Sequence, residues 1–295
     1  MKDLLSHTQS LFNHIYWFKQ DFGIKPSKEH YGSAINWTDI SERKDEFVAE
    51  LMSTIASWVY NKGDVKMIID ERFALTNDAG NAANHLTNLA YAKFRKDRPQ
   101  GQFGELLLFN FMQHFFQAAP LLRKQPITTS TGMERFGADA IHYKSENGEH
   151  IMYLGESKCY ESKYQFNKAF EKAVGSISTT FSNLSKELNL YVYDGFIETR
   201  LEDVVKRYKA GTLDPVRFEL VCLIAYNETK ALVKTKEDEI KKSIQDVISE
   251  RCKGLEDKHY GACEAHVLER VNFIVFPIWA LDELLDTFKN SIGAR

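Results

Sequence analysis

Residues 137–158 read GADAIHYKSENGEHIMYLGESK, two apolar-rich runs separated by an Asn-Gly pair. A type I′ turn needs positive φ at both of its central residues, and Asn147-Gly148 is a dipeptide that strongly favours it. We therefore expect a β-hairpin with a two-residue loop. Its register would place Asp139 directly opposite Glu156, near the open end of the hairpin.

These two carboxylates and Lys158 would share one face of the hairpin, because side chains in a strand alternate between its faces. The same face carries Ile141 and Leu154, so the charges would lie on the apolar side, with a polar side opposite. Two carboxylates ~4 Å apart repel by about 4 kcal/mol at an effective dielectric of about 20. Protonation of one carboxyl, the nearby lysine or a divalent cation would offset that repulsion. A bulge or a longer loop would instead separate the charges onto opposite faces.

A third acidic residue, Glu105, lies in the apolar stretch QFGELLLFNFMQHFF, residues 102–116. Leu108 and Phe109 follow it at helical spacing, so the pattern predicts a largely buried helix. A carboxylate that is buried in such a helix needs a partner. That partner would be a basic side chain, or the same cation that the hairpin carboxylates bind.

A cluster of carboxylates with a lysine suits metal-dependent hydrolysis of a phosphodiester. Mg²⁺ and Mn²⁺ take oxygen ligands, neutralise charge on the scissile phosphate and lower the pKa of a bound water. Lys158 would orient that water or stabilise the negative charge that develops on the phosphate. A salt bridge at the end of a sheet is the alternative interpretation of the same three residues.

Asp139 is followed, after sixteen intervening residues, by Glu156-Ser157-Lys158. This motif resembles that of the PD-(D/E)xK nuclease superfamily, although no proline precedes the aspartate. The resemblance implies a restriction-endonuclease-like fold and a Mg²⁺ or Mn²⁺ cofactor. It implies that Asp139, Glu156 and the backbone carbonyl of Ser157 are metal ligands. Lys158 would be the catalytic lysine, and Glu105, in the preceding helix, would be the auxiliary acid and a further metal ligand.

Three segments of the chain are also similar to the HamA family: FGADAIHYK, YLGESKCY and GQFGELLLFNFM, residues 136–144, 153–160 and 101–112. Members of this family are the nuclease subunit of the two-component Hachiman anti-phage system and work beside a superfamily 2 helicase. The resemblance implies a DNA nuclease that is controlled by a HamB-like helicase partner. The alternatives are a catalytically inactive adaptor subunit with a nuclease-like fold, and a free-standing restriction-type endonuclease.

Helical patterns alternate with apolar, β-branched runs along the chain, which predicts an α/β or α+β fold with a mixed central sheet between helices. The charged stretch 94–101 is the expected boundary between an N-terminal α/β region, residues 1–100, and a nuclease-like core, residues 101–295. The N-terminal region is a candidate for partner binding. The expected helices are residues 46–60, 81–93, 102–118, 164–188, 234–252 and 282–290, and the expected strands outside the hairpin are residues 66–73, 217–226 and 270–278.

The chain of 295 residues carries a net charge of −3 at neutral pH, unlike a stand-alone nucleic-acid-binding protein. A nuclease of this charge would need a local basic surface, a metal or a partner to hold DNA. Lys163, Lys168 and Lys172 follow the hairpin on an expected helix and are candidates for phosphate contact, although solvated lysines are commoner. Four scattered cysteines, no signal-peptide pattern and no apolar run of membrane length predict a reduced, cytoplasmic protein.

Overall fold

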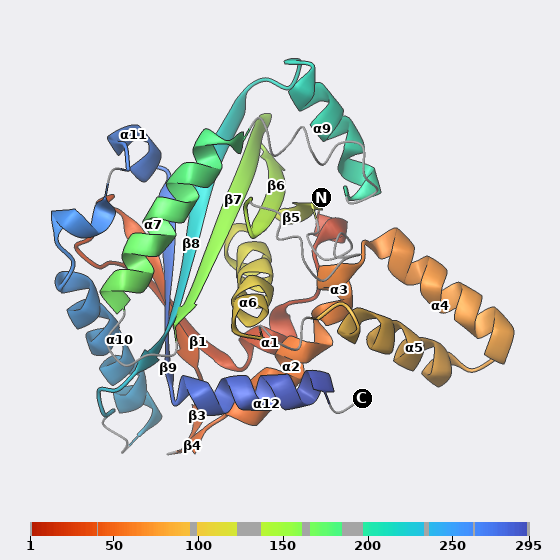
Figure 1. Cartoon of the computed structure of the whole chain (residues 1–295), viewed down its shortest axis with the longest axis horizontal. Helices are drawn as coiled ribbons and strands as arrows, with labels where there is room; N and C mark the ends of the chain where they lie inside the picture. Colours follow the sequence, from red (N-terminus) through yellow and green to blue (C-terminus); the bar gives the residue numbers. More distant parts are fainter. Residues whose placement is uncertain are drawn as a thin grey trace.

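The structure, a computed structural model, describes residues 2–39, 41–94, 99–122, 137–160, 166–184, 197–232, 236–261 and 263–293. Its centre is a seven-stranded mixed sheet with the strand order β1-β2-β9-β8-β7-β6-β5. Helices cover both faces of this sheet (Figure 1). The predicted α/β class with a mixed central sheet is therefore confirmed.

The elements are numbered in chain order. The strands are β1 (Ile15–Asp21), β2 (Glu29–Ile35), β3 (Trp37–Thr38), β4 (Ser41–Glu42), β5 (Ala119–Leu122), β6 (Ala140–Glu146), β7 (Glu149–Tyr160), β8 (Val216–Glu228) and β9 (Val271–Trp279). The α-helices are α1 (Gln9–Phe12), α2 (Lys44–Ser53), α3 (Ile55–Val59), α4 (Lys62–Thr76), α5 (Ala79–Tyr91), α6 (Pro99–Phe116), α7 (Phe166–Ser182), α9 (Glu202–Lys209), α10 (Glu237–Lys253), α11 (Ala265–Leu268) and α12 (Leu281–Gly293). Short 3₁₀ helices are η1 (Lys2–Leu4), η3 (Thr199–Leu201) and η4 (Asp257–Tyr260).

The central strands β7, β8 and β9 are parallel to one another and rich in apolar residues. In β8, every residue from Leu220 to Tyr226 is buried. Strands that are covered on both faces read as continuous apolar runs of this kind rather than as alternating patterns. α7 and α10 contribute to the core on one face of the sheet, and α2, α6 and α12 contribute to the core on the other.

The hairpin of β6 and β7 forms with the predicted turn. Asn147 and Gly148 have φ values of 52° and 82°, both positive, as a type I′ turn requires. The ladder runs without a shift over seven residue pairs, from the turn to Ala140 and Gly155. The two-residue loop and the register that it sets are therefore confirmed along the ladder.

Away from its turn, the hairpin is buried on both faces, which corrects the prediction of one apolar face and one polar face. Ile141 and Leu154, on the predicted apolar face, are buried in the core that α7 covers. Tyr153, expected on a polar face, is buried in the core that α6 covers, and its neighbour across the strands, His142, is fully buried. Helices on both sides of the sheet remove the polar face that a single covering layer would leave.

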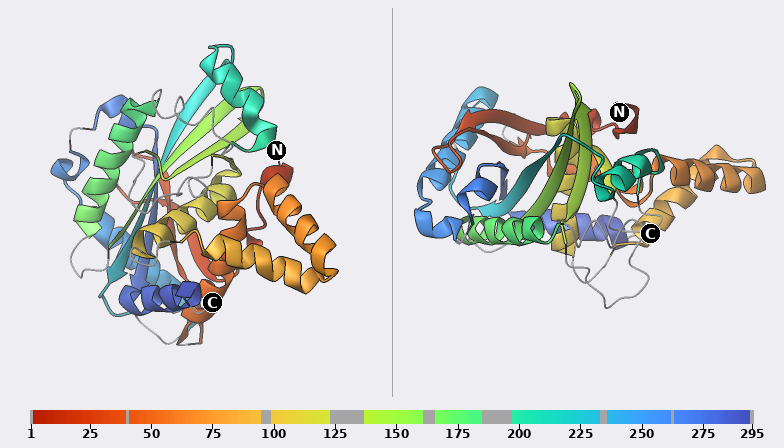
Figure 2. Two further views of the ribbon diagram at one scale, coloured as in Figure 1. Left: turned by 45° about the vertical axis from the view of Figure 1, so that its right-hand side comes forward. Right: turned by 90° about the horizontal axis from the view of Figure 1, so that it is seen from above.

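The N-terminal region contributes β1 and β2 to the same sheet as the later strands, because β2 pairs with β9. The division of the chain at residues 94–101 stays a prediction, and residues 95–98 lie outside the described residues. α4 and α5 pack against each other and project from the body of the molecule (Figure 2).

Residues 66–73, predicted as a strand, lie within α4, so that prediction is wrong. Asn61 caps the helix, because its side chain accepts a hydrogen bond from the Asp64 amide at 2.8 Å. Arg72 faces α5 and donates to Asn81 at 2.8 Å. Half of the segment consists of residue types that favour helix, namely lysine, methionine, glutamate and arginine. The short apolar run at its centre fits either a helix or a strand.

His30 joins β2 to β9, where the ladder between the two strands holds only two residue pairs. The Phe273 amide donates to His30 Nδ1 at 3.2 Å, so Nδ1 is the unprotonated nitrogen. The other ring nitrogen, Nε2, donates to the Pro26 carbonyl at 3.1 Å. Burial lowers the pKa of His30 to about 4, and the side chain is 0% exposed. The neutral imidazole thus acts as a cross-link between the edge pair of strands and the rest of the sheet.

The free energy of unfolding is expected to fall between about pH 6.5 and pH 4 because of His30. In that range the unfolded chain binds a proton at this side chain and the folded chain excludes it, and the loss reaches about 3 kcal/mol. Chemical denaturation at several pH values, compared with the variant His30→Gln, measures this contribution. The same pH dependence in both proteins would show that His30 is not its source.

Candidate functional site

Three of the predicted site residues lie at the open end of the hairpin, where β7 continues past the first residue of β6. Glu156 and Lys158 are on β7, and Asp139 directly precedes β6. Because β7 and β8 are parallel, this end of β7 is also the carboxyl-terminal end of the central strands. Functional side chains of α/β proteins are often placed at that edge of the sheet.

Glu156 and Lys158 form a half-buried ion pair on one face of β7. Lys158 Nζ lies 2.5 Å from Glu156 Oε1, and the two side chains are 23% and 8% exposed. Burial acts to lower the pKa of Lys158, but the Glu156 carboxylate, with a contribution from Asp139, outweighs it, so that the pKa is raised. Lys158 is therefore a firmly charged cation at neutral pH.

The face that Glu156 occupies is the one covered by α7. The neighbour of Glu156 on β8 is Cys222, whose thiol is buried. Burial raises the pKa of this thiol well above its usual value, and the charge of Glu156 adds to that rise. Cys222 Sγ in turn lies 3.7 Å from the Ala173 carbonyl of α7. The prediction that Glu156 and Lys158 share a face is confirmed, because they are two residues apart on a regular strand.

Asp139 does not continue the ladder opposite Glu156, which corrects the predicted direct opposition. The last pair of the ladder is Ala140 and Gly155. The Asp139 amide donates to the carbonyl of the same Gly155 at 2.9 Å, which is one residue out of register. Its carboxylate Oδ2 accepts from the Ser157 amide at 2.9 Å and from Ser157 Oγ at 3.1 Å. The side chain thus takes the place of a backbone partner at the edge of β7 and still acts electrostatically on Lys158.

The first turns of α6 close over the other side of β7. Gln100 Nε2 donates to the Cys159 carbonyl at 2.6 Å. A Cβ atom added to Gly104 would lie 3.1 Å from Ser157 Oγ, and one added to Gly155 would lie 2.7 Å from Met112 Sδ. Helix and strand therefore approach as closely as these glycines permit.

Glu105 follows Gly104 on α6 and is only partly buried, whereas the sequence predicts a buried carboxylate. The close contact of Gly104 with Ser157 brings this part of α6 to the open end of the hairpin. The role of Glu105 as a metal ligand and auxiliary acid stays a prediction.

The oxygen atoms at the open end are of the kind that Mg²⁺ binds. Asp139 and Glu156 supply carboxylates, and a strand residue points its N–H and C=O to the same side, so the Ser157 carbonyl faces the end of β6 where Asp139 lies. Within the described ranges, no three His, Cys, Asp or Glu side chains gather closely enough to hold a metal by themselves. Mg²⁺ is commonly held by one or two carboxylates, with waters and substrate phosphates completing its coordination. The donor set at the hairpin fits that pattern.

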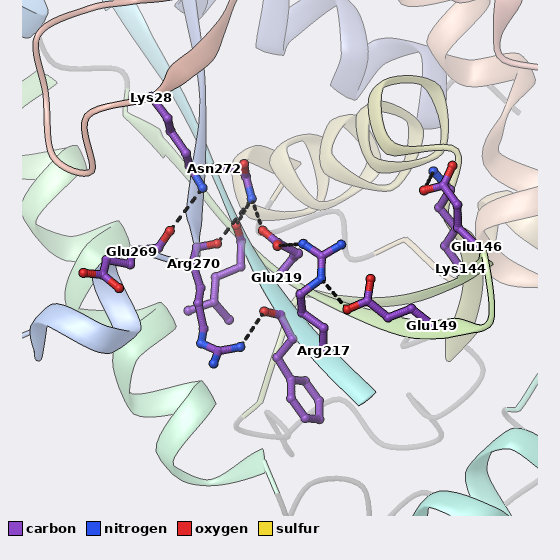
Figure 3. A network of polar contacts seen from close by, with 11 residues as sticks. Lys28, Lys144, Glu146, Glu149, Arg217, Glu219, Glu269, Arg270 and Asn272 are labelled. Carbon is purple, nitrogen blue, oxygen red and sulfur yellow. Dashed lines mark hydrogen bonds and ion pairs between the residues drawn. The ribbon is translucent and has the colours of Figure 1, made fainter. Parts of the chain in front are cut away.

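The opposite ends of the same strands carry charges in a different arrangement (Figure 3). Arg217 lies between two carboxylates, 3.0 Å from Glu149 and 2.5 Å from Glu219. Asn272 donates to Glu219 at 2.9 Å. Acids here alternate with basic and amide donors, as expected of a structural network. At the open end of the hairpin, Lys158 pairs with Glu156, and Asp139 binds the amide and the hydroxyl of Ser157.

The lysines predicted to contact phosphate lie on or before α7. Lys168 and Lys172 are exposed on this helix, and Lys163 lies outside the described residues. Lys172 Nζ is 5.8 Å from the centre of the Tyr160 ring, at the end of β7. Sequence reasoning missed Tyr160 and Gln100. The signal for Tyr160 was its place two residues after Lys158 on the same face, whereas nothing local marks Gln100.

A family model described as HamA matches residues 13–292 of the chain. The match includes the hairpin, α6 and nearly all of the N-terminal region. No curated protein matches the chain. Among the helices in the described ranges, none combines the length and the apolar character that a membrane span requires.

Proposed function

The chain belongs to the HamA family of Hachiman defence proteins, and we propose that it is a metal-dependent deoxyribonuclease. The observation that carries the proposal is the arrangement at the end of β7. A half-buried Glu156–Lys158 pair lies beside the Asp139 carboxylate, which Ser157 holds in place. The family supports a role in anti-phage defence, and this arrangement supports hydrolysis of phosphodiester bonds.

The residues divide the chemistry among them. Asp139, Glu156 and the Ser157 carbonyl would hold Mg²⁺ or Mn²⁺, with Glu105 as a further candidate ligand. The bound ion would neutralise charge on the scissile phosphate and lower the pKa of a bound water. Lys158 is kept cationic by its carboxylate neighbours. Its ammonium group would move away from Glu156 and donate a hydrogen bond to a phosphate oxygen or to the attacking water.

DNA would reach the site with the help of a helicase partner, because the chain itself is mildly acidic. Lys168 and Lys172 on α7, with Lys163 before it, would contact the phosphates on either side of the scissile bond. We place the partner contact on the N-terminal region, residues 1–100. Its helix α4 has no buried side chain and exposes Met67, Phe73 and Leu75, apolar surface of the kind that a protein partner covers.

Incubation of the purified protein with circular DNA tests the proposal. We expect cleavage in Mg²⁺ or Mn²⁺, alone or with its helicase partner, and intact DNA when a chelator is added. DNA that stays intact with metal and partner both present, together with no measurable binding of Mn²⁺, would identify a non-catalytic adaptor subunit instead.

A further inference from the structure

We propose that Ser157 is a positioning residue for the Asp139 carboxylate, acting through its side-chain hydroxyl. This inference rests on the proposed function, because the carboxylate matters as a cation ligand. Oδ2 of Asp139 accepts two hydrogen bonds from one residue, from the Ser157 amide at 2.9 Å and from its hydroxyl at 3.1 Å. The middle residue of the Glu156-Ser157-Lys158 motif thus contributes a side chain as well as a carbonyl.

Two donors on one oxygen fix the rotation of the carboxyl group. Without the hydroxyl, Oδ2 would keep only the amide as a donor from Ser157, so this residue would hold the carboxyl group less firmly. This matters because Asp139 lies outside the ladder, where one strand partner has already ended. The Ser157 hydroxyl therefore helps to hold Asp139 against β7, where the ladder no longer does so.

α6 limits where the Ser157 hydroxyl can lie. A Cβ on Gly104 would be 3.1 Å from Ser157 Oγ and 3.4 Å from Ser157 Cβ. The first distance is tighter than an ordinary contact, and the second is an ordinary contact. The helix thus closes over the hydroxyl. Ser157 is itself 9% exposed, so little water competes for its hydrogen bond.

The variant Ser157→Ala is expected to bind Mn²⁺ about tenfold more weakly, because partners that orient a metal-binding carboxylate carry effects of about 10- to 100-fold. Calorimetric titration of Mn²⁺ measures this without requiring cleavage. In the cleavage assay, the half-saturating Mn²⁺ concentration should rise by a similar factor, while the rate at saturating metal falls less. Thermal unfolding should be nearly unchanged, which separates positioning from a loss of fold.

Ser33→Ala is the matched control. Ser33 is a fully buried serine of the same sheet, and its hydroxyl has no hydrogen-bond partner among the described residues. This control should leave Mn²⁺ binding unchanged. Equal Mn²⁺ affinity in wild type and Ser157→Ala would overturn the inference, whereas a wild type that binds no Mn²⁺ would overturn the proposed function with it.

A double-mutant cycle with Gly104→Ala tests the geometry independently. The added methyl group presses on the Ser157 hydroxyl, so this variant should weaken Mn²⁺ binding severalfold in the wild-type background. In the Ser157→Ala background the methyl group meets only the Cβ atoms of residues 157 and 159, at 3.4 and 3.6 Å. Both distances are ordinary contacts, so its effect should disappear. Additive effects of the two substitutions would contradict a role for the hydroxyl in holding Asp139.

Discussion

Replacement of Lys158 by alanine is expected to slow DNA cleavage by about a thousandfold while leaving Mn²⁺ binding intact. General acid–base and electrostatic groups contribute about 10²- to 10⁴-fold each to rate. Lys158 carries a raised pKa next to Glu156 and is not one of the expected ligands, so its loss removes charge stabilisation without removing the cation site. Cleavage rates at saturating Mn²⁺, with calorimetric titration of the same samples, measure both effects.

The same hairpin offers a matched control for this experiment. Lys144 pairs with Glu146, two residues away along β6, at 2.9 Å (Figure 3). Its side chain is 22% exposed, against 23% for that of Lys158. Lys144→Ala removes an ion pair of the same kind at the far end of the strands and should leave cleavage unchanged. Equal cleavage by the two variants would place the catalytic cation elsewhere in the protein.

Replacement of Glu156 by glutamine should remove both the cation site and the cleavage. The amide keeps the shape of the side chain and an acceptor for Lys158, but it lacks the negative charge that a divalent cation requires. We expect Mn²⁺ affinity to fall by at least about 100-fold and cleavage to reach background. Calorimetry and the plasmid assay give the two readouts, and thermal unfolding checks the fold.

Glu146→Gln tests whether any acid of the hairpin would give the same result. Glu146 lies beside the turn, paired with Lys144 and exposed to solvent, so its charge contributes little to stability. This variant should bind Mn²⁺ and cleave DNA as wild type does. If Glu156→Gln also retained Mn²⁺ binding, Glu156 would be no more than the partner of Lys158 in a salt bridge.

The hairpin was predictable because its geometry is decided locally. Asn147-Gly148 selects the loop, and the loop sets the register over the whole ladder. The end of the ladder was not predictable in this way. The Asp139 carboxylate competes with a backbone acceptor for the Ser157 amide, and side chains of this kind often interrupt regular pairing.

The remaining errors have causes that lie outside the local sequence. The hairpin lacks a polar face because α6 covers the side that Tyr153 occupies, and that packing joins segments distant in the chain. The pairing of β2 with β9 likewise joins the two ends of the chain, through a ladder of two residue pairs. The segment at residues 66–73 is too short and too mixed in composition to distinguish a strand from a turn of helix.

The anomalous diffraction of crystals grown with Mn²⁺ would locate the bound cation. A cation site at the open end of the hairpin predicts an anomalous peak about 2.1 Å from carboxylate oxygens of both Asp139 and Glu156. The same crystals of Glu156→Gln should show no peak there. If the crystallised protein cleaves DNA in Mn²⁺, but clear density for the two side chains shows no peak between them, the catalytic cation binds elsewhere.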